Sequence, residues 1–164
     1  MFIIKHRRRR EQKTNAKKRL ALLKSDKTRV IIRRLLSGMQ IQFIDYDANG
    51  DKTLVSVVSK HLKKLGWNYS TKSVPASYLT GLIAGKKALE SDINEAVLDT
   101  GLQTLTKGSR IYAALKGLVD AGVNIPHSAE IFPSSERLNG DHIQNINKEE
   151  FSKNLEEMKK KITG

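Results

Sequence analysis

The chain contains no cysteine, which excludes a disulfide framework and any metal site built on thiolates. The lack of cysteine also fits a protein of the reducing cytoplasm. No apolar run approaches the roughly 18–20 residues that a membrane-spanning helix needs, so we expect no membrane contact. Residues 1–4 include an apolar stretch that precedes the positive charge instead of following it, which is the reverse of a secretory signal.

Patterns typical of catalytic and metal sites are missing as well. No Gly-x-Ser-x-Gly nucleophile elbow occurs. The four histidines (His6, His61, His127 and His142) do not have the spacing of metal ligands. The residues therefore give no sign of a nucleophilic catalytic site or of a histidine metal site, and we expect no cofactor or small-molecule substrate. His127 is expected to form hydrogen bonds in a loop, and not to act as a catalyst.

Three short motifs resemble sites but have simpler explanations. Residues 45–50 begin like a calcium-binding loop, yet Ser56 stands where that loop needs glutamate, so we expect a turn. Residues 81–87 are one residue shorter than a phosphate loop, and their small side chains would let a helix approach the sheet closely. Asp45 and Asp99 could hold Mg²⁺ in a nuclease. No third acid is suitably placed, so turn and loop acids are the favoured interpretation.

Acidic residues are scarce in the first quarter of the chain. Residues 1–40 carry fourteen Lys and Arg against two acids, which is a net +12 of the chain's +13. Such a basic block repels itself and suits a polyphosphate partner, because each neutralised phosphate releases condensed counterions. Residues 6–24 contain no Phe, Tyr or Trp. We therefore expect this basic block to clamp phosphates and not to stack on bases.

These patterns give a set of candidate phosphate-binding residues. Arg29 and Arg33 would share one face of a strand, with Arg34 on the other. The start of a helix at residues 106–110 could bind a phosphate through free backbone N–H groups, or could be an ordinary cap. The candidates are Arg7, Arg8, Arg9, Arg10, Lys13, Lys17, Arg19, Lys24, Arg29, Arg33, Arg34, Lys107, Ser109 and Arg110.

Three strands are expected to form a meander. Residues 29–35 are rich in β-branched side chains, residues 39–43 alternate apolar side chains with Gln, and residues 53–58 return along them. Residues 37–38 would join the first two strands, and the Asp-Ala-Asn-Gly turn at residues 47–50 would join the last two.

Helices and short strands then alternate, which predicts an α/β fold with a mixed sheet and helices packed on it. The expected helices are 15–24 with Asn15 as cap, 60–65 with Ser59 as cap, one opening at Pro75 with Ser73 as cap, 109–122 with Ser109 as cap, and one after Asn147. Short strands are expected at 96–98 and 123–125, and irregular structure at 127–146.

The expected organisation has three parts. Residues 1–28 form a basic arm whose short helix becomes ordered on its partner. Residues 29–125 form the α/β core. Residues 126–164 form an irregular extension and a C-terminal helix whose apolar stripe packs on its own body; the stripe consists of Phe151, Leu155, Met158 and Ile162.

Several segments in order resemble one family, the 5S-rRNA-binding large-subunit ribosomal proteins numbered eighteen in bacteria and archaea and five in eukaryotes. The similarity spans about residues 7–145 and is of the archaeal type. It is carried by RRRR at 7–10, KTN at 13–15, PASYLTGLIAGKKA at 75–88, AVLD at 96–99, GSR at 108–110, AALKGLVDAG at 113–122, IPH at 125–127 and ERLNGDHI at 136–143.

The resemblance implies a ribonuclease-H-like arrangement of the mixed sheet and a structural, non-enzymatic role in translation. It implies binding to 5S rRNA, association with large-subunit rRNA and a second 5S-binding ribosomal protein, and a place in the central protuberance. It adds Thr14 to the RNA-contacting residues of the arm. The chain departs from the family at Leu35 and Leu36, where relatives are usually polar, and at residues 105–107, where relatives often have proline.

Two other classes of function stay open at this point. A general nucleic-acid-binding protein that acts only through its cationic tail would not distinguish among structured RNAs. A metal-dependent nuclease would require Asp45 and Asp99 for Mg²⁺-dependent cleavage.

Overall fold

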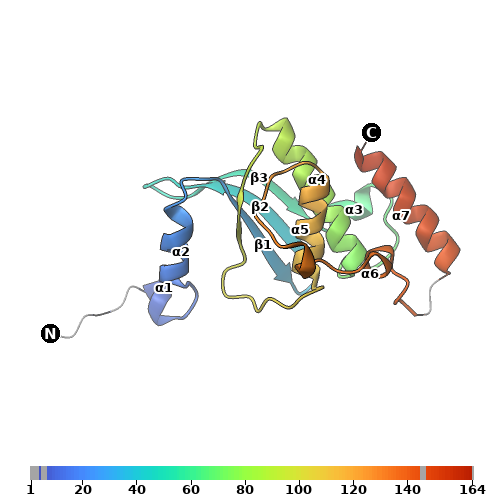
Figure 1. Cartoon of the computed structure of the whole chain (residues 1–164), viewed down its shortest axis with the longest axis horizontal. Coiled ribbons are helices and arrows are strands. Elements are labelled where there is room, and N and C mark those ends of the chain that lie inside the picture. The colour runs from blue at the N-terminus through green and yellow to red at the C-terminus, as the bar shows by residue number, and fades with distance from the viewer. Residues whose placement is uncertain (1–3, 5–6, 145–146, 164) are drawn as a thin grey trace.

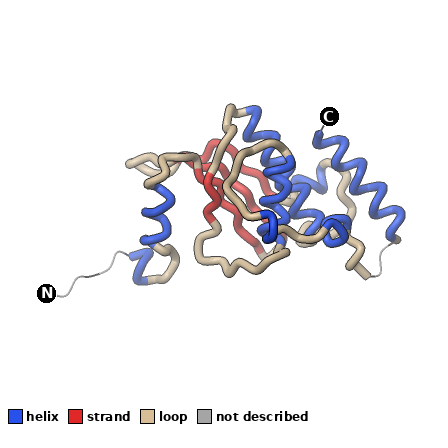
Figure 2. Tube along the Cα trace, in the orientation of Figure 1, coloured by secondary structure: helices blue, strands red, loops and turns tan. Residues whose placement is uncertain are grey.

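The computed structural model describes residue 4, residues 7–144 and residues 147–163. Its long axis runs from the basic arm at the N-terminal end to the C-terminal helix, with the sheet between them (Figure 1). Figure 2 shows that the strands form one cluster, with most of the helices on one side of it.

The sheet has four strands in the order β3-β2-β1-β4. They are β1 (Arg29–Leu35), β2 (Gly38–Asp45), β3 (Lys52–Val58) and β4 (Val97–Asp99). The first three form the predicted antiparallel meander, while β4 lies parallel to β1. The mixed sheet confirms the predicted α/β class; the ribonuclease-H-like arrangement stays a prediction.

Alternation along the strands gives the sheet two unlike faces. On the inner face Val30 pairs with Phe43 and Ile32 with Ile41, and all four side chains are fully buried. The intervening residues point to the outer face, where the half-buried Gln42 marks the polar side of β2. Period-2 alternation requires this division, because successive side chains of a strand point in opposite directions.

Two long helices cover the inner face: α4 (Val74–Glu90) and α5 (Arg110–Asp120) (Figure 1). The predicted cap of α4 is confirmed, since the Ser73 side chain accepts a hydrogen bond from the Ala76 N–H at 3.3 Å.

The small residues of α4 serve a different contact from the one expected. A Cβ built at Gly81 would lie 2.1 Å from the Ala114 carbonyl oxygen, and one built at Gly117 would lie 2.2 Å from the Tyr78 carbonyl oxygen. The prediction that Gly81 brings the helix close to the sheet is therefore wrong. The close approach is between α4 and α5, because each helix places a glycine against the other's backbone.

The remaining helical elements are short, except for the last. They are α1 (Arg7–Arg10), α2 (Ala16–Leu23), α3 (His61–Lys64), a 3₁₀ turn η1 (Ala129–Ile131), α6 (Ser135–Asn139) and α7 (Lys148–Thr163). No helix within the described ranges has both the length and the apolarity that crossing a bilayer requires.

The C-terminal helix packs on its own body, as predicted. Phe151, Leu155, Met158 and Ile162 are buried and belong to the same hydrophobic core as the sheet. The Phe151 ring meets Trp67 and Tyr69 edge to face, with centroid distances of 5.4 and 4.7 Å. This geometry favours aromatic pairs beyond simple burial.

Four local predictions need correction. Ser59 does not cap α3; its hydroxyl accepts a hydrogen bond from the Met39 N–H at 2.9 Å, and Lys60 takes the cap position. The β1–β2 turn is at residues 36–37, because Gly38 already pairs with Leu35. Residues 123–125 form a single bridge and not a strand, since Asn124 alone pairs with the segment before β4.

The fourth correction concerns residues 127–146, which were expected to be irregular. They contain η1 and α6, elements too short to show a helical period in the sequence. Residues 145–146 lie outside the described part.

The glycine contact between α4 and α5 predicts that a Gly→Ala substitution destabilises the protein, which is the opposite of its usual effect within a helix. At an open helix position, Gly→Ala stabilises by roughly 0.8–1 kcal/mol. Gly117→Ala should instead lower the free energy of unfolding by about 1–3 kcal/mol, because the methyl group meets backbone atoms of α4. Urea unfolding measures the change, and Ser152→Ala on the exposed side of α7 is the control. A Gly117→Ala protein more stable than the wild type would contradict the close packing.

Candidate nucleic-acid interface

The first helix of the arm concentrates positive charge around one carboxylate. Glu11 accepts a hydrogen bond from Arg7 Nε at 2.9 Å and pairs with Lys13 Nζ at 2.8 Å. These bonds, with that of Lys13 the stronger, lower the pKa of Glu11 below its usual range. The groups are largely exposed, so they orient the arm's cations more than they stabilise the fold.

The second helix contacts the body through polar side chains, and its Leu22 and Leu23 are half-buried. Its predicted cap is confirmed, because Asn15 accepts a hydrogen bond from the Lys18 N–H at 3.1 Å. None of the residues of α2 is buried. Lys18 Nζ donates to Thr100 Oγ1 at 3.2 Å, and Arg19 Nη2 lies 2.9 Å from both carboxylate oxygens of Asp51. The placement of the arm therefore depends on these side chains.

A chain of alternating charges continues from α2 across the sheet. Asp51, which also accepts from Arg29 Nη2 at 2.7 Å, joins the arm to β1. Arg29 Nη1 lies 3.6 Å from Asp99 Oδ2, and Arg33 Nη1 donates to the Asp99 carbonyl at 2.7 Å. We call this series of paired side chains the ion chain; it consists of Arg19, Asp51, Arg29, Asp99 and Arg33. It connects α2, β1 and β4 with the residue that precedes β3.

Arg29 is the buried centre of the ion chain, with 1% of its side chain exposed. A buried guanidinium is tolerated only when carboxylates pair with it, since removing one partner leaves an uncompensated charge. Burial raises the pKa of Asp51, but hydrogen bonds and charge from Arg29 and Arg19 outweigh it and hold the pKa below its usual range. Asp51 therefore stays ionised.

Gly101 makes room for the end of the ion chain. Its N–H donates to Asp99 Oδ1 at 2.7 Å, and its φ of +61° is a left-handed conformation that favours glycine. A Cβ at this position would lie 2.9 Å from Arg33 Nη2. The glycine thus orients Asp99 and leaves space for the Arg33 guanidinium.

A cleft of about 220 Å³ lies between the arm and the outer face of the sheet. Six of its lining residues are cationic and one is acidic. The lining residues are Arg8, Lys13, Thr14, Asn15, Lys18, Arg19, Arg29, Ile31, Arg33, Asp99, Gly101 and Leu102. Arg8 Nε donates to Thr14 Oγ1 at 2.9 Å, which orients its guanidinium. Such a lining suits an anionic group of phosphate size.

The structure brings together some of the predicted residues and separates others. Arg8, Lys13, Thr14, Arg19, Arg29 and Arg33 line the cleft. Arg7, Arg10, Lys17, Lys24 and Arg34 are exposed outside its lining, and the side chain of Arg9 lies outside the described part. Lys18 was missed, although it lies on the expected helix between Lys17 and Arg19, both of which were predicted. Asp51 was missed too, and no local pattern marks it.

The second predicted phosphate site stands apart from the cleft. Lys107 pairs with Glu130 at 3.3 Å, and Arg110 Nη1 donates to the Lys72 carbonyl at 3.0 Å. Ser109 occupies the cap position of α5, but its side chain makes no capping bond. None of these three candidate residues lines the cleft.

The proposed carboxylate pair is engaged elsewhere. Asp45 accepts a hydrogen bond from Thr28 Oγ1 at 2.7 Å, while Asp99 belongs to the ion chain. Across the described ranges, no three acidic or histidine side chains are grouped so that they could hold a metal ion. Asp47 forms the expected turn, accepting from the Asn49 N–H at 3.0 Å. His127 Nδ1 lies 2.7 Å from the Ile125 carbonyl, the hydrogen-bonding role expected of it.

Comparison with known proteins identifies one family. Residues 1–95 and 90–128 match the family described as ribosomal large subunit proteins 60S L5 and 50S L18. The large ribosomal subunit protein uL18 of Korarchaeum cryptofilum is 49% identical over 156 residues, which cover 95% of this chain and 77% of that protein. The uL18 protein of Methanothrix thermoacetophila is 45% identical over 163 residues, covering 99% and 96%. That of Methanococcus maripaludis is 46% identical, covering 94% and 86%.

The ion chain predicts a large effect from one neutral substitution. Asp51→Asn should lower the free energy of unfolding at pH 7 by about 2–3 kcal/mol, because the buried Arg29 keeps only Asp99 as a charged partner. Denaturant unfolding measures it. Glu130→Gln, which removes an exposed pair, is the control and should change stability by less than about 1 kcal/mol. Equal effects of the two substitutions would show that the ion chain does not stabilise the fold.

The lowered pKa of Asp51 also predicts a pH dependence. A carboxyl whose pKa is lower in the folded protein stabilises it above the pKa of the unfolded chain, about 3.9. That contribution is lost as the pH falls through the folded pKa. The stability difference between wild type and Asp51→Asn should therefore be constant from about pH 5 to 7 and shrink below pH 4. Thermal unfolding across this range measures it, and a difference that grows on acidification would contradict the assignment.

Proposed function

Because the chain belongs to the family of ribosomal large subunit proteins 60S L5 and 50S L18, we propose that it binds 5S rRNA and anchors it in the central protuberance of the large subunit. Membership makes it a structural protein of the cytoplasmic ribosome and not an enzyme. The proposed partners also include large-subunit rRNA and a second 5S-binding ribosomal protein, both supported by the family resemblance.

The observation that carries the proposal is the cleft with six cations between the arm and the sheet. Four of these cations are contributed by the arm and two by β1, so an RNA strand in the cleft would be held from both sides. The guanidinium of Arg8 can form two parallel bonds to a phosphate, and the ammonium of Lys13 adds a point charge. Ile31 and Leu102 supply an apolar wall against which a ribose can pack.

Burial separates two roles among the cations of the cleft. Arg29 is almost completely enclosed and holds Asp51 and Asp99, so we assign it the role of positioning the arm. Lys13 pairs with Glu11 but is 63% exposed, so its ammonium can also approach a phosphate. A rigidly placed arm reads the shape of a folded RNA, because helical RNA is recognised mainly through its backbone and 2′-hydroxyl groups.

The other predicted residues lie outside the cleft. Arg7, Arg10, Lys17 and Lys24 are exposed along the arm and would extend the phosphate-binding surface beyond the cleft. Contacts of Arg34, Lys107, Ser109 and Arg110 with RNA stay predictions. They would require the RNA to reach a second side of the body.

Filter binding to 5S rRNA across a salt series tests the proposal. The full-length protein should bind in the presence of excess tRNA and lose roughly 10³–10⁵ in affinity between low and moderately high salt, as expected for about 6–10 phosphate contacts. Removing residues 1–24 should weaken binding and flatten the salt dependence. Arg8→Gln with Lys13→Gln should reduce the salt slope by about two, one for each lost phosphate contact.

The matched control removes the same charge from the opposite end of the molecule. Lys153→Gln with Lys160→Gln, both exposed on α7, should leave the salt slope unchanged. Equal effects of the two double substitutions would show that net charge alone matters. Equal affinity for 5S rRNA, tRNA and duplex DNA would indicate a general cationic tail and would contradict specific binding of 5S rRNA.

A further inference from the structure

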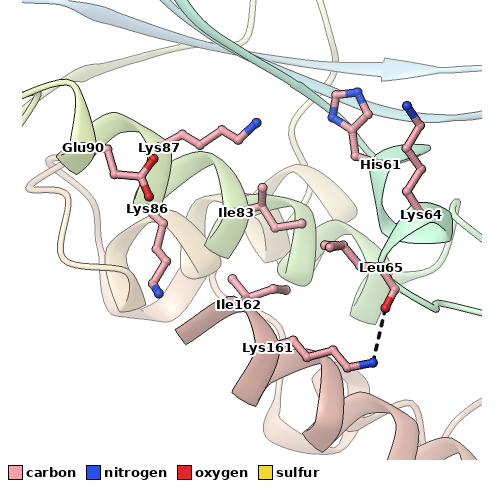
Figure 3. Close-up of a pocket in the computed structure, with 9 residues that line it drawn as sticks. All are labelled: His61, Lys64, Leu65, Ile83, Lys86, Lys87, Glu90, Lys161 and Ile162. Carbon is pink, nitrogen blue, oxygen red and sulfur yellow. Dashed lines mark hydrogen bonds between the residues drawn. The ribbon is translucent and has the colours of Figure 1, made fainter. Parts of the chain in front are cut away.

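A second pocket, of about 410 Å³, lies between α3, α4 and α7 (Figure 3). It is far from the arm, because α3 and α7 lie at the opposite end of the long axis from α1 and α2 (Figure 1). No residue of the arm and no residue of the ion chain lines it. A ligand there could be bound while the cleft holds RNA.

The floor of the pocket is aliphatic. Leu65 at the end of α3, Ile83 of α4 and Ile162 of α7 converge on it, as Figure 3 shows. Leu65 is 40% exposed, whereas Ile83 and Ile162 are nearly buried. An exposed leucine beside two buried isoleucines makes a concave apolar surface, and covering it would remove apolar area from water.

The rim of the pocket is cationic. Lys64, Lys86, Lys87 and Lys161 line it together with one acid, Glu90. None of the four lysines forms an ion pair with another described residue; Lys161 Nζ makes only a long bond, 3.5 Å, to the Leu65 carbonyl. Lys87 and Lys161 also lie in the last turns of their helices, where they offset the helix dipoles. Lys64 and Lys86 increase the positive potential around the same opening.

We propose that this pocket binds a short acidic segment of another protein, with an aliphatic side chain on the Leu65–Ile83–Ile162 floor and carboxylates paired with the surrounding lysines. Charge complementarity and the apolar floor together identify this occupant. The volume matches that of pockets that enclose a small group or a few side chains. Rim charges would steer the segment, and the floor would supply the contact that is buried.

The lining distinguishes this pocket from the RNA cleft. The cleft is lined by four arginines, whose planar guanidinium groups match phosphate, whereas the pocket is lined by no arginine and by one aromatic side chain, His61. An RNA backbone could place only a ribose on the aliphatic floor, which buries less apolar area than an aliphatic side chain does. A peptide provides both an aliphatic side chain and carboxylates within a few residues.

Methyl NMR of the full-length protein tests the proposal with a defined probe. The probe is the blocked hexapeptide Glu-Glu-Leu-Asp-Glu-Glu, with matched peptides in which serine replaces leucine or glutamine replaces every acid. The methyl signals of Leu65, Ile83 and Ile162 should shift saturably with the first peptide only. Leu102 beside the cleft reports the nonspecific attraction of any acidic peptide to the arm, which should be equal for the leucine and serine peptides.

Two substitutions with matched controls give the expected size of the effect. Lys86→Gln with Lys161→Gln should weaken peptide binding at the floor about tenfold, whereas Lys153→Gln with Lys160→Gln should not. Leu65→Gln should abolish the difference between the leucine and serine peptides. Leu54→Gln, at a similarly exposed position on β3, should preserve it.

Each contrary result would overturn the proposal. Unchanged floor signals with the leucine peptide would show that the pocket does not bind such a segment. Lysine substitutions that lower thermal stability but leave peptide affinity intact would show that the lysines only offset helix dipoles. Weaker binding of 5S rRNA by the Lys86→Gln and Lys161→Gln protein would identify the pocket as an RNA surface. The proposal does not depend on the RNA cleft, because failure of 5S rRNA binding leaves the shifts at the floor unaffected.

Discussion

The pairing of buried Arg29 with Asp51 and Asp99 is the interaction on which the arrangement of the arm depends. Helix α2 buries none of its residues completely, and only Leu22 and Leu23 are half-buried among its leucines, so apolar burial contributes little to its placement. Its position follows from Arg19, which shares the Asp51 carboxylate with Arg29, and from Lys18 on Thr100. A charged contact in the body thus orients a segment that would otherwise repel itself.

The two ends of the molecule use positive charge in different ways. At the cleft, four of the six cations are arginines, and hydrogen bonds to Thr14, Asp51 and Asp99 align three of them. At the other end, lysines surround an aliphatic pocket and lie at helix ends. The first arrangement matches the geometry of phosphate groups, and the second combines long-range attraction with an apolar contact. Between them, the glycine contact of α4 and α5 allows the helices to cover the sheet.

Features that depend on residues close in the sequence were predicted correctly, whereas features that depend on residues far apart in the sequence were not. The bounds of β1 were predicted correctly because β-branched residues and alternation are local signals. The stripe of α7 was predicted for the same reason. Ser59 was assigned as a cap because serine before a helix commonly caps, but the Met39 N–H across the sheet competes for its hydroxyl. Gly81 was assigned to the sheet because nothing local indicates that Gly117 faces it.

The sequence by itself determined the family, the three-stranded meander and the long helices, and the concentration of positive charge in the arm, since each depends on residues close along the chain. Only the tertiary structure decided which of those cations share a cleft, because the answer depends on carboxylates tens of residues away: Asp51 holds Arg19 and Arg29, and Asp99 holds Arg33. It likewise decided that lysines from three separate helices meet around one aliphatic floor. Charge count is a property of composition, whereas charge placement requires the chain to fold.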